Sequence, residues 1–205
     1  MRRTVPCVIV MACLVAGSFV ARAEEADHAI HEELRALLTR IETAINTEKY
    51  EEMAPCFHEN VRATTINQEV ILSRAGIAPY FRKWFGPGGY LKKLHMTLTA
   101  DALTELNAER TFGIVRGSGE EDYTLADGRL FPMKTRWTAM VVKDADGAWR
   151  ILAIHIGTNF LDNPILAKAE KALGFAAGMG FLAGVVLTAG VAFLLARRRR
   201  SAKPA

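Results

Sequence analysis

The sequence predicts an α+β domain, with N-terminal helices packed on a curved antiparallel sheet, followed by one C-terminal transmembrane helix. Three observations lead to this fold class. Apolar residues recur at helical spacing between residues 27 and 45, several runs after residue 90 alternate apolar and polar side chains, and residues 174–196 carry no charge. Helices that precede strands are typical of α+β domains, and an uncharged run of this length can cross a bilayer.

The charges separate a central domain from two basic ends. Every acidic residue lies between Glu24 and Glu170, whereas eight of the 26 lysines and arginines lie outside that span. The central part therefore holds 18 cations against 22 acids, a net charge of −4. Binding to phosphates needs cations clustered on one folded face. We therefore expect no nucleic-acid partner.

Residues 1–23 have the features of a secretory signal peptide. Arg2 and Arg3 precede an apolar run over residues 5–20, and Ala21 and Ala23 are the small residues of a cleavage site. Cleavage after Ala23 would leave Cys56 as the only cysteine, for which a small buried apolar role is expected. An uncleaved membrane anchor is the alternative interpretation.

The remaining boundaries follow from the C-terminal half. The extracytoplasmic domain is expected over residues 24–163, a short juxtamembrane linker helix over 164–173, the transmembrane helix over 174–196 and a basic cytoplasmic tail over 197–205. Cationic flanks stay on the cytoplasmic side of a membrane. The sequence thus predicts a single-pass type I protein of the cell inner membrane with a periplasmic domain. A sorting tail removed by a protease is the alternative.

Small residues recur every fourth position along the predicted span, at Ala176, Gly180, Gly184 and Thr188. Such a stripe lets two helix backbones approach closely. It predicts a homodimer or packing on another membrane protein, and the general abundance of small residues in membrane helices explains it equally well.

The helices of the domain are expected in its first half. Asp27 is a candidate N-cap for a helix whose apolar face is Ile30, Leu34, Leu37, Leu38, Ile41 and Ile45. A short helix follows over 48–54 and a strand over 58–65. A third helix begins after Ser73, with Ile77, Tyr80, Phe81, Trp84 and Phe85 on its apolar side.

The second half predicts the sheet. Strands are expected over 94–106, 111–116, 134–142 and 149–158, with a polar loop over 117–128. Asp144 to Gly147 provide the turn between the last two strands.

This order of elements resembles the SnoaL-like branch of the nuclear transport factor 2 (NTF2-like) superfamily over about residues 28–161. The resemblance rests on the run Leu72-Ser-Arg-Ala-Gly-Ile-x-x-Tyr-Phe81 and on the closing strand with Asp146, Gly147, Trp149, Arg150, Ile151 and His155. It implies an NTF2-like cone with a pocket between sheet and helices, commonly dimeric through the sheet. Function does not follow from it, because this fold hosts isomerases, dehydratases, cyclases and non-catalytic binding modules.

Strand alternation selects the candidate site residues. Trp149, Ile151, Ala153 and His155 are expected on one face of the last strand, with Arg136 or Thr138 opposite the histidine. A histidine beside an arginine suits an anionic or carbonyl-bearing ligand. The candidate ligand-binding residues are Arg136, Thr138, His155, Trp149 and His95, and His155 is the candidate catalytic residue. An ordinary polar pair at the end of a strand is the alternative, and one bulge would reverse the faces.

The carboxylates weaken the enzymatic interpretation. The acids of the sheet region, namely Asp101, Glu105, Glu109, Glu120, Glu121 and Asp122, are expected at strand ends and in loops. No metal site and no cofactor are predicted, because His28 and His31 lack a third ligand nearby.

These observations leave three functions. The first is a non-catalytic module that binds a small apolar or amphipathic molecule or an envelope protein. The second is an enzyme of the isomerase, dehydratase or hydrolase type that uses His155 as base and Arg136 as electrostatic partner in the cone pocket. The third is a dimeric assembly domain set by the sheet and the small-residue stripe.

Overall fold

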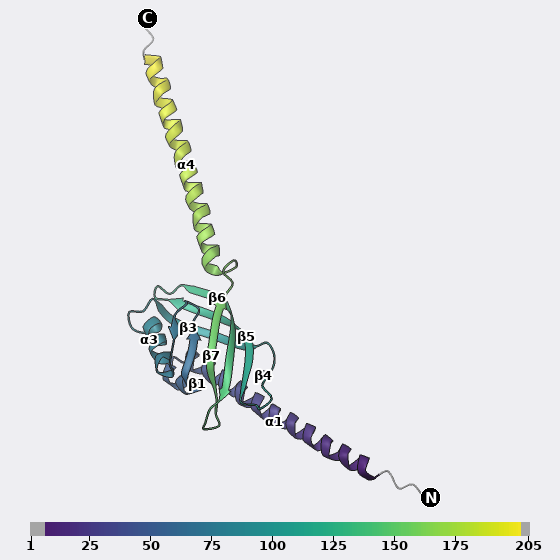
Figure 1. The fold of residues 1–205 in the computed structure, drawn as a ribbon. Coiled ribbons are helices and arrows are strands. Elements are labelled where there is room, and N and C mark those ends of the chain that lie inside the picture. The colour runs from purple at the N-terminus through teal and green to yellow at the C-terminus, as the bar shows by residue number, and fades with distance from the viewer. Residues whose placement is uncertain (1–6, 202–205) are drawn as a thin grey trace. The chain divides into compact units, whose positions relative to one another are not determined.

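The computed structural model describes the backbone of residues 7–201 and the side chains of residues 27–198. The chain divides after Thr158 into two compact units. The described strands all lie in the first unit, and one long helix makes up most of the second (Figure 1). The predicted signal peptide lies partly outside the described residues, and its cleavage after Ala23 stays a prediction.

The first unit begins with α1, which spans Cys7–Asn46. Ile30, Leu37, Ile41 and Ile45 are buried on its inner face, as the helical spacing predicts. The remaining helical segments are α2 (Tyr50–Met53), the 3-10 turns η1 (Ala54–Cys56) and η2 (Arg74–Gly76), and α3 (Ile77–Phe85).

Asp27 has a different role from the one expected. The helix α1 runs through this position, so Asp27 is not an N-cap. Its two carboxylate oxygens instead accept hydrogen bonds from the guanidinium of Arg110, and these bonds hold the pKa of Asp27 below its usual range. This pair ties α1 to the turn that precedes β5 (Phe112–Leu125).

The sheet has the strand order β2-β1-β7-β6-β5-β3, and the short β4 (Glu105–Leu106) pairs with β5. The other strands are β1 (Phe57–Thr64), β2 (Val70–Ile71), β3 (Leu91–Ala100), β6 (Leu130–Lys143) and β7 (Trp149–Thr158). β1 runs parallel to β7, and the other pairs are antiparallel.

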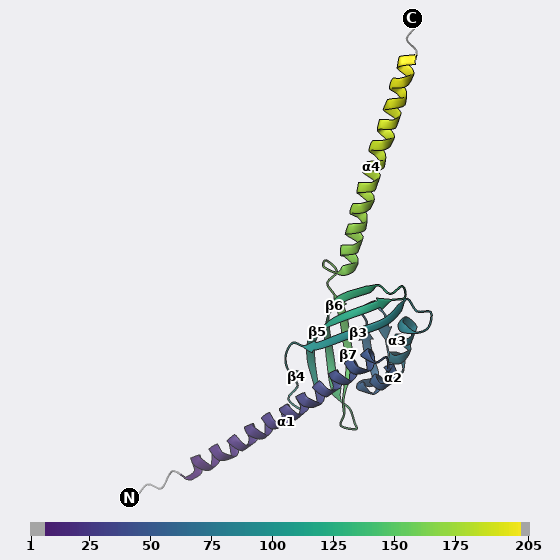
Figure 2. The same cartoon turned by 180° about the vertical axis from the view of Figure 1, so that it is seen from behind.

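One face of the sheet is covered by α1 and α3, and α2 packs against both of these helices (Figure 2). The side chain of Asn46 exchanges hydrogen bonds with the backbone of Met96, and Glu42 accepts one from the backbone of Leu98. These bonds attach the C-terminal half of α1 to β3. The core therefore lies between the helices and the face that carries Met96 and Trp137. Cys56 is buried in it, as expected.

The prediction of a polar loop over residues 117–128 is wrong. Most of it belongs to β5, which pairs from Gly117 to Leu125 with β3 and from Phe112 to Thr124 with β6. The loop reaches only from Ala126 to Arg129. Glycine and acidic residues have low strand propensity, but two flanking strands supply the hydrogen bonds that hold this segment extended.

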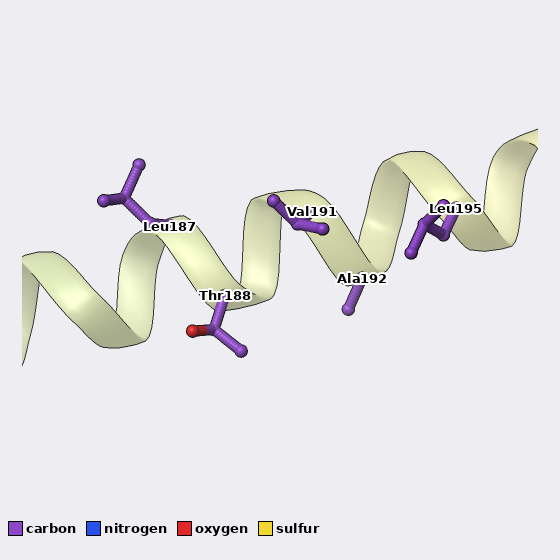
Figure 3. Close-up of a pocket in the computed structure, with 5 residues that line it drawn as sticks. All are labelled: Leu187, Thr188, Val191, Ala192 and Leu195. Carbon is purple, nitrogen blue, oxygen red and sulfur yellow. The ribbon is translucent and has the colours of Figure 1, made fainter.

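The second unit contains α4 (Pro164–Ser201). Asn163 caps this helix, because its Oδ1 accepts hydrogen bonds from the backbone N–H groups of Ile165 and Leu166. Within the described residues, Pro164–Arg198 is the one helix long and apolar enough to cross a membrane. A shallow hollow on its surface is lined by Leu187, Thr188, Val191, Ala192 and Leu195 (Figure 3).

Candidate functional site

A carboxyl group is buried in the middle of the sheet. Glu121 lies on β5 between Met96 of β3 and Met133 of β6, and only 5% of its surface is exposed. Alternation along β5 places Glu121 on the same face as Gly117 and Gly119, which the helices cover. The expectation that Glu120, Glu121 and Asp122 lie in a loop or at a strand end is therefore wrong.

Two hydroxyl groups donate hydrogen bonds to this carboxyl. The hydroxyl of Tyr123 donates to Oε2 of Glu121, and Oγ1 of Thr135 donates to Oε1 across 2.6 Å. Burial raises the pKa of Glu121, against the lowering effect of these two bonds. Burial and the adjacent Glu121 also raise the pKa of Tyr123 well above its usual range, so its phenol stays protonated at neutral pH.

Gly119 makes this contact possible. A Cβ atom at this position would lie 2.6 Å from Oγ1 of Thr135 and 3.1 Å from Oε1 of Glu121. Both atoms belong to the hydrogen bond that satisfies the buried carboxyl. A side chain at this position would therefore displace the Thr135 hydroxyl from the carboxyl of Glu121.

Aromatic side chains from α2 and α3 form a stacked cluster that meets the buried acid through Tyr123. The ring of Phe85 stacks on that of Tyr123 with a centroid distance of 6.4 Å, and Phe81 stacks on Tyr50 at 5.0 Å. Tyr80 packs edge-on against Phe81. Tyr80 and Tyr123 are half-buried, whereas Glu121 is buried.

A second carboxylate lies on the far side of Tyr80. The Tyr80 hydroxyl donates to Oδ1 of Asn67 across 3.2 Å, and Nδ2 of Asn67 donates to Oε1 of Glu69 across 3.0 Å. Glu69 also accepts hydrogen bonds from Lys83 and from Nε1 of Trp84. The bond from Lys83 is the main cause that lowers the pKa of Glu69.

The pKa values of the two carboxyl groups are therefore shifted in opposite directions. Burial favours the protonated form of Glu121, whereas Lys83 favours the ionised form of Glu69. The charges of both groups raise the pKa of Tyr80, although burial is the largest cause of that shift. Carboxyl groups whose pKa values are displaced in opposite directions are typical of sites that bind or transfer protons.

Most of the predicted site residues lie on the other face of the sheet. His95, Arg136, Thr138 and His155 are exposed, and they alternate with buried residues of the core face. Thr138 lies directly opposite His155, which is one of the two pairings expected from the sequence. Arg136 pairs with both carboxylate oxygens of Asp101. A role for these residues in binding or catalysis stays a prediction.

Trp149 does not share a face with His155. The register of β6 and β7 shifts by one residue at Leu152. Met140 pairs with Ala153 and the next residue, Val141, pairs with Ile151, so Leu152 has no partner on β6. This bulge reverses the alternation, so Trp149 and Ile151 are buried and His155 is exposed. The expected common face of these residues is wrong for this reason. Nε1 of Trp149 is buried without a hydrogen-bond partner.

The sequence contained one signal for the buried acid. Gly119, Glu121, Tyr123 and Leu125 are spaced two residues apart. If residues 117–125 form a strand, the first three of these residues lie on the same face as the apolar Leu125. Among the described residues, no group of three His, Cys, Asp or Glu side chains is placed to hold a metal ion.

The fold and this interior define an α+β cone with helices on the concave face of the sheet. The chain belongs to the SnoaL-like domain family, which matches residues 27–155. No curated protein matches the chain.

Solved structures share the fold at low sequence identity. A candidate scytalone dehydratase from Novosphingobium aromaticivorans is 12% identical, with a TM-score of 0.58 over 67% of this chain and 89% of that chain. A candidate dehydratase of the NTF2-like family from Streptomyces avermitilis is 12% identical, with a TM-score of 0.54 over 65% and 98%. A ketosteroid isomerase-like protein from Erwinia carotovora atroseptica is 14% identical, with a TM-score of 0.53 over 62% and 95%.

Proposed function

We propose that the domain binds a small, uncharged and largely apolar molecule that carries a carbonyl or hydroxyl group. The observation that carries this proposal is the buried carboxyl of Glu121 with its two hydroxyl partners, Tyr123 and Thr135. Buried polar groups of this kind fix the orientation of a ligand in an otherwise apolar site.

The chemistry of the surroundings supports this class of ligand. A protonated Glu121 donates a hydrogen bond to a carbonyl oxygen, and an ionised Glu121 accepts one from a hydroxyl group. Tyr123 contacts this carboxyl, and Phe85, Phe81 and Tyr50 continue the aromatic cluster from Tyr123. The burial that favours the neutral form of Glu121 would also disfavour a charged ligand beside it, so an uncharged ligand fits better than an acidic one.

We expect Glu121→Gln to weaken the binding of 2-naphthol, used as an aromatic hydroxyl probe, by roughly tenfold or more. The physical reason is the loss of a hydrogen bond to a charged or strongly polarised group, which contributes about 1.5–3 kcal/mol. Saturation-transfer NMR of the full chain in lipid nanodiscs measures the affinity, with empty nanodiscs as the blank.

The matched control is Glu120→Gln, because Glu120 is the exposed neighbour of Glu121 on the opposite face of β5. It should bind the probe as the wild type does. Equal affinity of the wild type and Glu121→Gln would contradict the proposal, as would an equal loss in both variants.

Proton transfer is a second candidate function. The opposite pKa shifts of Glu121 and Glu69 favour it, and so does the likeness in fold to proteins described as dehydratases and as ketosteroid isomerase-like. In such a reaction Tyr123 or protonated Glu121 would stabilise the oxygen of a carbonyl substrate while a carboxylate removes a proton from the adjacent carbon.

We expect an enzyme of this kind to exchange the α-protons of 2-tetralone in D₂O faster than buffer does. Glu121→Gln should slow this exchange by about a hundredfold or more, which is the usual contribution of a general acid or base. Proton NMR follows the loss of signal. Exchange at the buffer rate by the wild type would remove the enzymatic candidate and leave the binding proposal untouched.

The alternative enzyme with His155 and Arg136 would act on the exposed face of the sheet. That face also fits an envelope protein as partner, because it carries charged and polar side chains such as Arg116 and Thr138. Substitution of His155 by alanine tests the exposed face alone, because it leaves the contacts of Glu121 intact. A loss of activity or of partner binding in this variant would favour the exposed face over the interior site.

We propose that α4 anchors the protein in the cell inner membrane as a single-pass type I protein, with the domain in the periplasm. The apolar length of the helix and the four arginines after it support this topology. Mass spectrometry of the mature N-terminus tests the proposed removal of residues 1–23.

Assembly into a homodimer is proposed through the sheet and the small residues of α4. Gly180 and Gly184 have open space around them, and the hollow beside Thr188 continues the same stripe (Figure 3). Substitution of both glycines by isoleucine should abolish self-association in detergent, and an unchanged dimer would contradict a role of the stripe.

A further inference from the structure

The chain leaves the domain at one end of the sheet, where Thr158 ends β7. Oγ1 of Thr158 donates a hydrogen bond to the backbone oxygen of Lys134 on β6 across 2.9 Å. Beyond this point β6 continues back to Leu130, and the turn that joins β6 to β5 follows. The other end of the sheet carries the turn between β6 and β7, at Asp144 to Gly147.

Two large apolar side chains are exposed at the end where the chain leaves. Leu130 at the start of β6 is 65% exposed, and Tyr90 just before β3 is 66% exposed. The segments that carry them meet, because the backbone N–H of Ala126 in the β5–β6 turn donates to the backbone oxygen of Tyr90. Tyrosine at a membrane surface places its ring among the lipids and its hydroxyl in water.

Cations accompany these two side chains. Lys92 and Lys93 on β3 and Arg129 in the turn are exposed. Arg129 pairs with Asp127, and within residues 27–198 no carboxylate forms an ion pair with either lysine. We call Tyr90, Lys92, Lys93, Arg129 and Leu130 the exit tip. The exit tip holds three cations, and Asp127 neutralises one of them, Arg129.

The tether is short enough for the exit tip to reach lipid headgroups. Five residues join Thr158 to Pro164, and at about 3.4 Å per extended residue they could span at most roughly 17 Å. Hydrogen bonds from Asn163 to the backbone oxygens of Asn159 and Phe160 make this segment more compact than that. The expected linker helix over residues 164–173 adds roughly 15 Å. The headgroup layer extends about 5–7 Å beyond the hydrocarbon core, so the tip lies within reach of it.

We propose that the exit tip docks on the surface of a bilayer that contains anionic lipids. Tyr90 and Leu130 enter the headgroup layer, and Lys92 and Lys93 bind lipid phosphates. Basic residues with exposed apolar side chains are the combination that such surfaces attract. This proposal rests on the anchoring of the chain by α4.

Hydrogen–deuterium exchange of the full chain in nanodiscs tests the proposal. We compare discs of neutral phosphatidylcholine with discs that contain phosphatidylglycerol as well. Amides over residues 88–93 and 125–130 should exchange at least about fivefold more slowly in the anionic discs. High salt should remove this difference, because it screens exposed charges.

The variant with Lys92→Gln and Lys93→Gln should lose the protection. Lys143→Gln is the matched control, since Lys143 is an exposed lysine at the opposite end of β6, and it should keep the protection. The turn at Asp144 to Gly147 should exchange equally in both kinds of disc.

Three results would overturn the proposal. One is equal exchange of the exit tip in neutral and anionic discs. Another is protection that appears in detergent and grows with protein concentration, which would assign the tip to contact between two copies of the chain. A chain that does not enter the discs would overturn the anchoring as well, and this is visible beforehand in size-exclusion chromatography.

Discussion

Gly117→Ala should destabilise the domain by about 3 kcal/mol and lower its melting temperature by roughly 10 °C. A Cβ atom at residue 117 would overlap the indole ring of Trp137 and the backbone oxygen of Thr99. Trp137 is buried, and its Nε1 donates to the backbone oxygen of Ser118. Neither the indole nor the neighbouring strand can move without breaking contacts of the core.

Gly157→Ala is the control for this substitution. Gly157 also lies in a strand, but no atom lies within 4 Å of a Cβ built there. Thermal unfolding followed by circular dichroism should show a change of less than about 0.5 kcal/mol for it. A similarly small change for Gly117→Ala would show that the sheet does not depend on the close approach of Trp137.

Glu121→Gln should become more stable relative to the wild type as the pH rises. Burial raises the pKa of Glu121 above the ordinary value of 4.5. Between the unfolded-state pKa and this higher folded-state pKa, the folded chain holds more protons than the unfolded chain. The stability of the wild type therefore falls as pH rises through that window, whereas glutamine does not titrate.

Urea unfolding between about pH 4 and pH 8 measures this effect as the difference between the two proteins. The difference should be constant below the ordinary pKa of glutamate and should then grow in favour of the variant. The same series with Glu120→Gln serves as the control for loss of a carboxylate from the exposed face. A difference that shrinks with rising pH would mean that the hydrogen bonds from Tyr123 and Thr135 outweigh burial.

The helical half of the domain was largely predictable. The apolar spacing from Ile30 to Ile45 identifies a helix whichever surface it packs on, because the period of 3.6 residues is a property of the helix itself. Gly86 ends α3 for an equally local reason, because Pro87 follows it and favours an extended conformation at the preceding residue. Pro55 does not end the helical run, since it lies within η1. The role of Asp27 could not be predicted locally, since its partner, Arg110, lies far away in the sequence.

The faces of the strands were harder to predict. Alternation assigns two faces but does not say which one the helices cover, and one bulge at Leu152 separates His155 from Trp149. The segment from Gly117 to Asp122 has the composition of a loop. It became a strand because β3 and β6 pair with it on both sides.

Composition and the spacing of neighbouring residues were enough to predict the helices of the domain, the family resemblance and the apolar C-terminal helix, but not the strand β5 over residues 117–125. The position of the buried carboxyl instead depends on contacts between residues that lie far apart in the sequence. Glu121, Tyr123 and Thr135 come from two strands, and Tyr80 from a helix. Their meeting depends on the register of β5 and β6 and on the packing of α3, which no local pattern specifies.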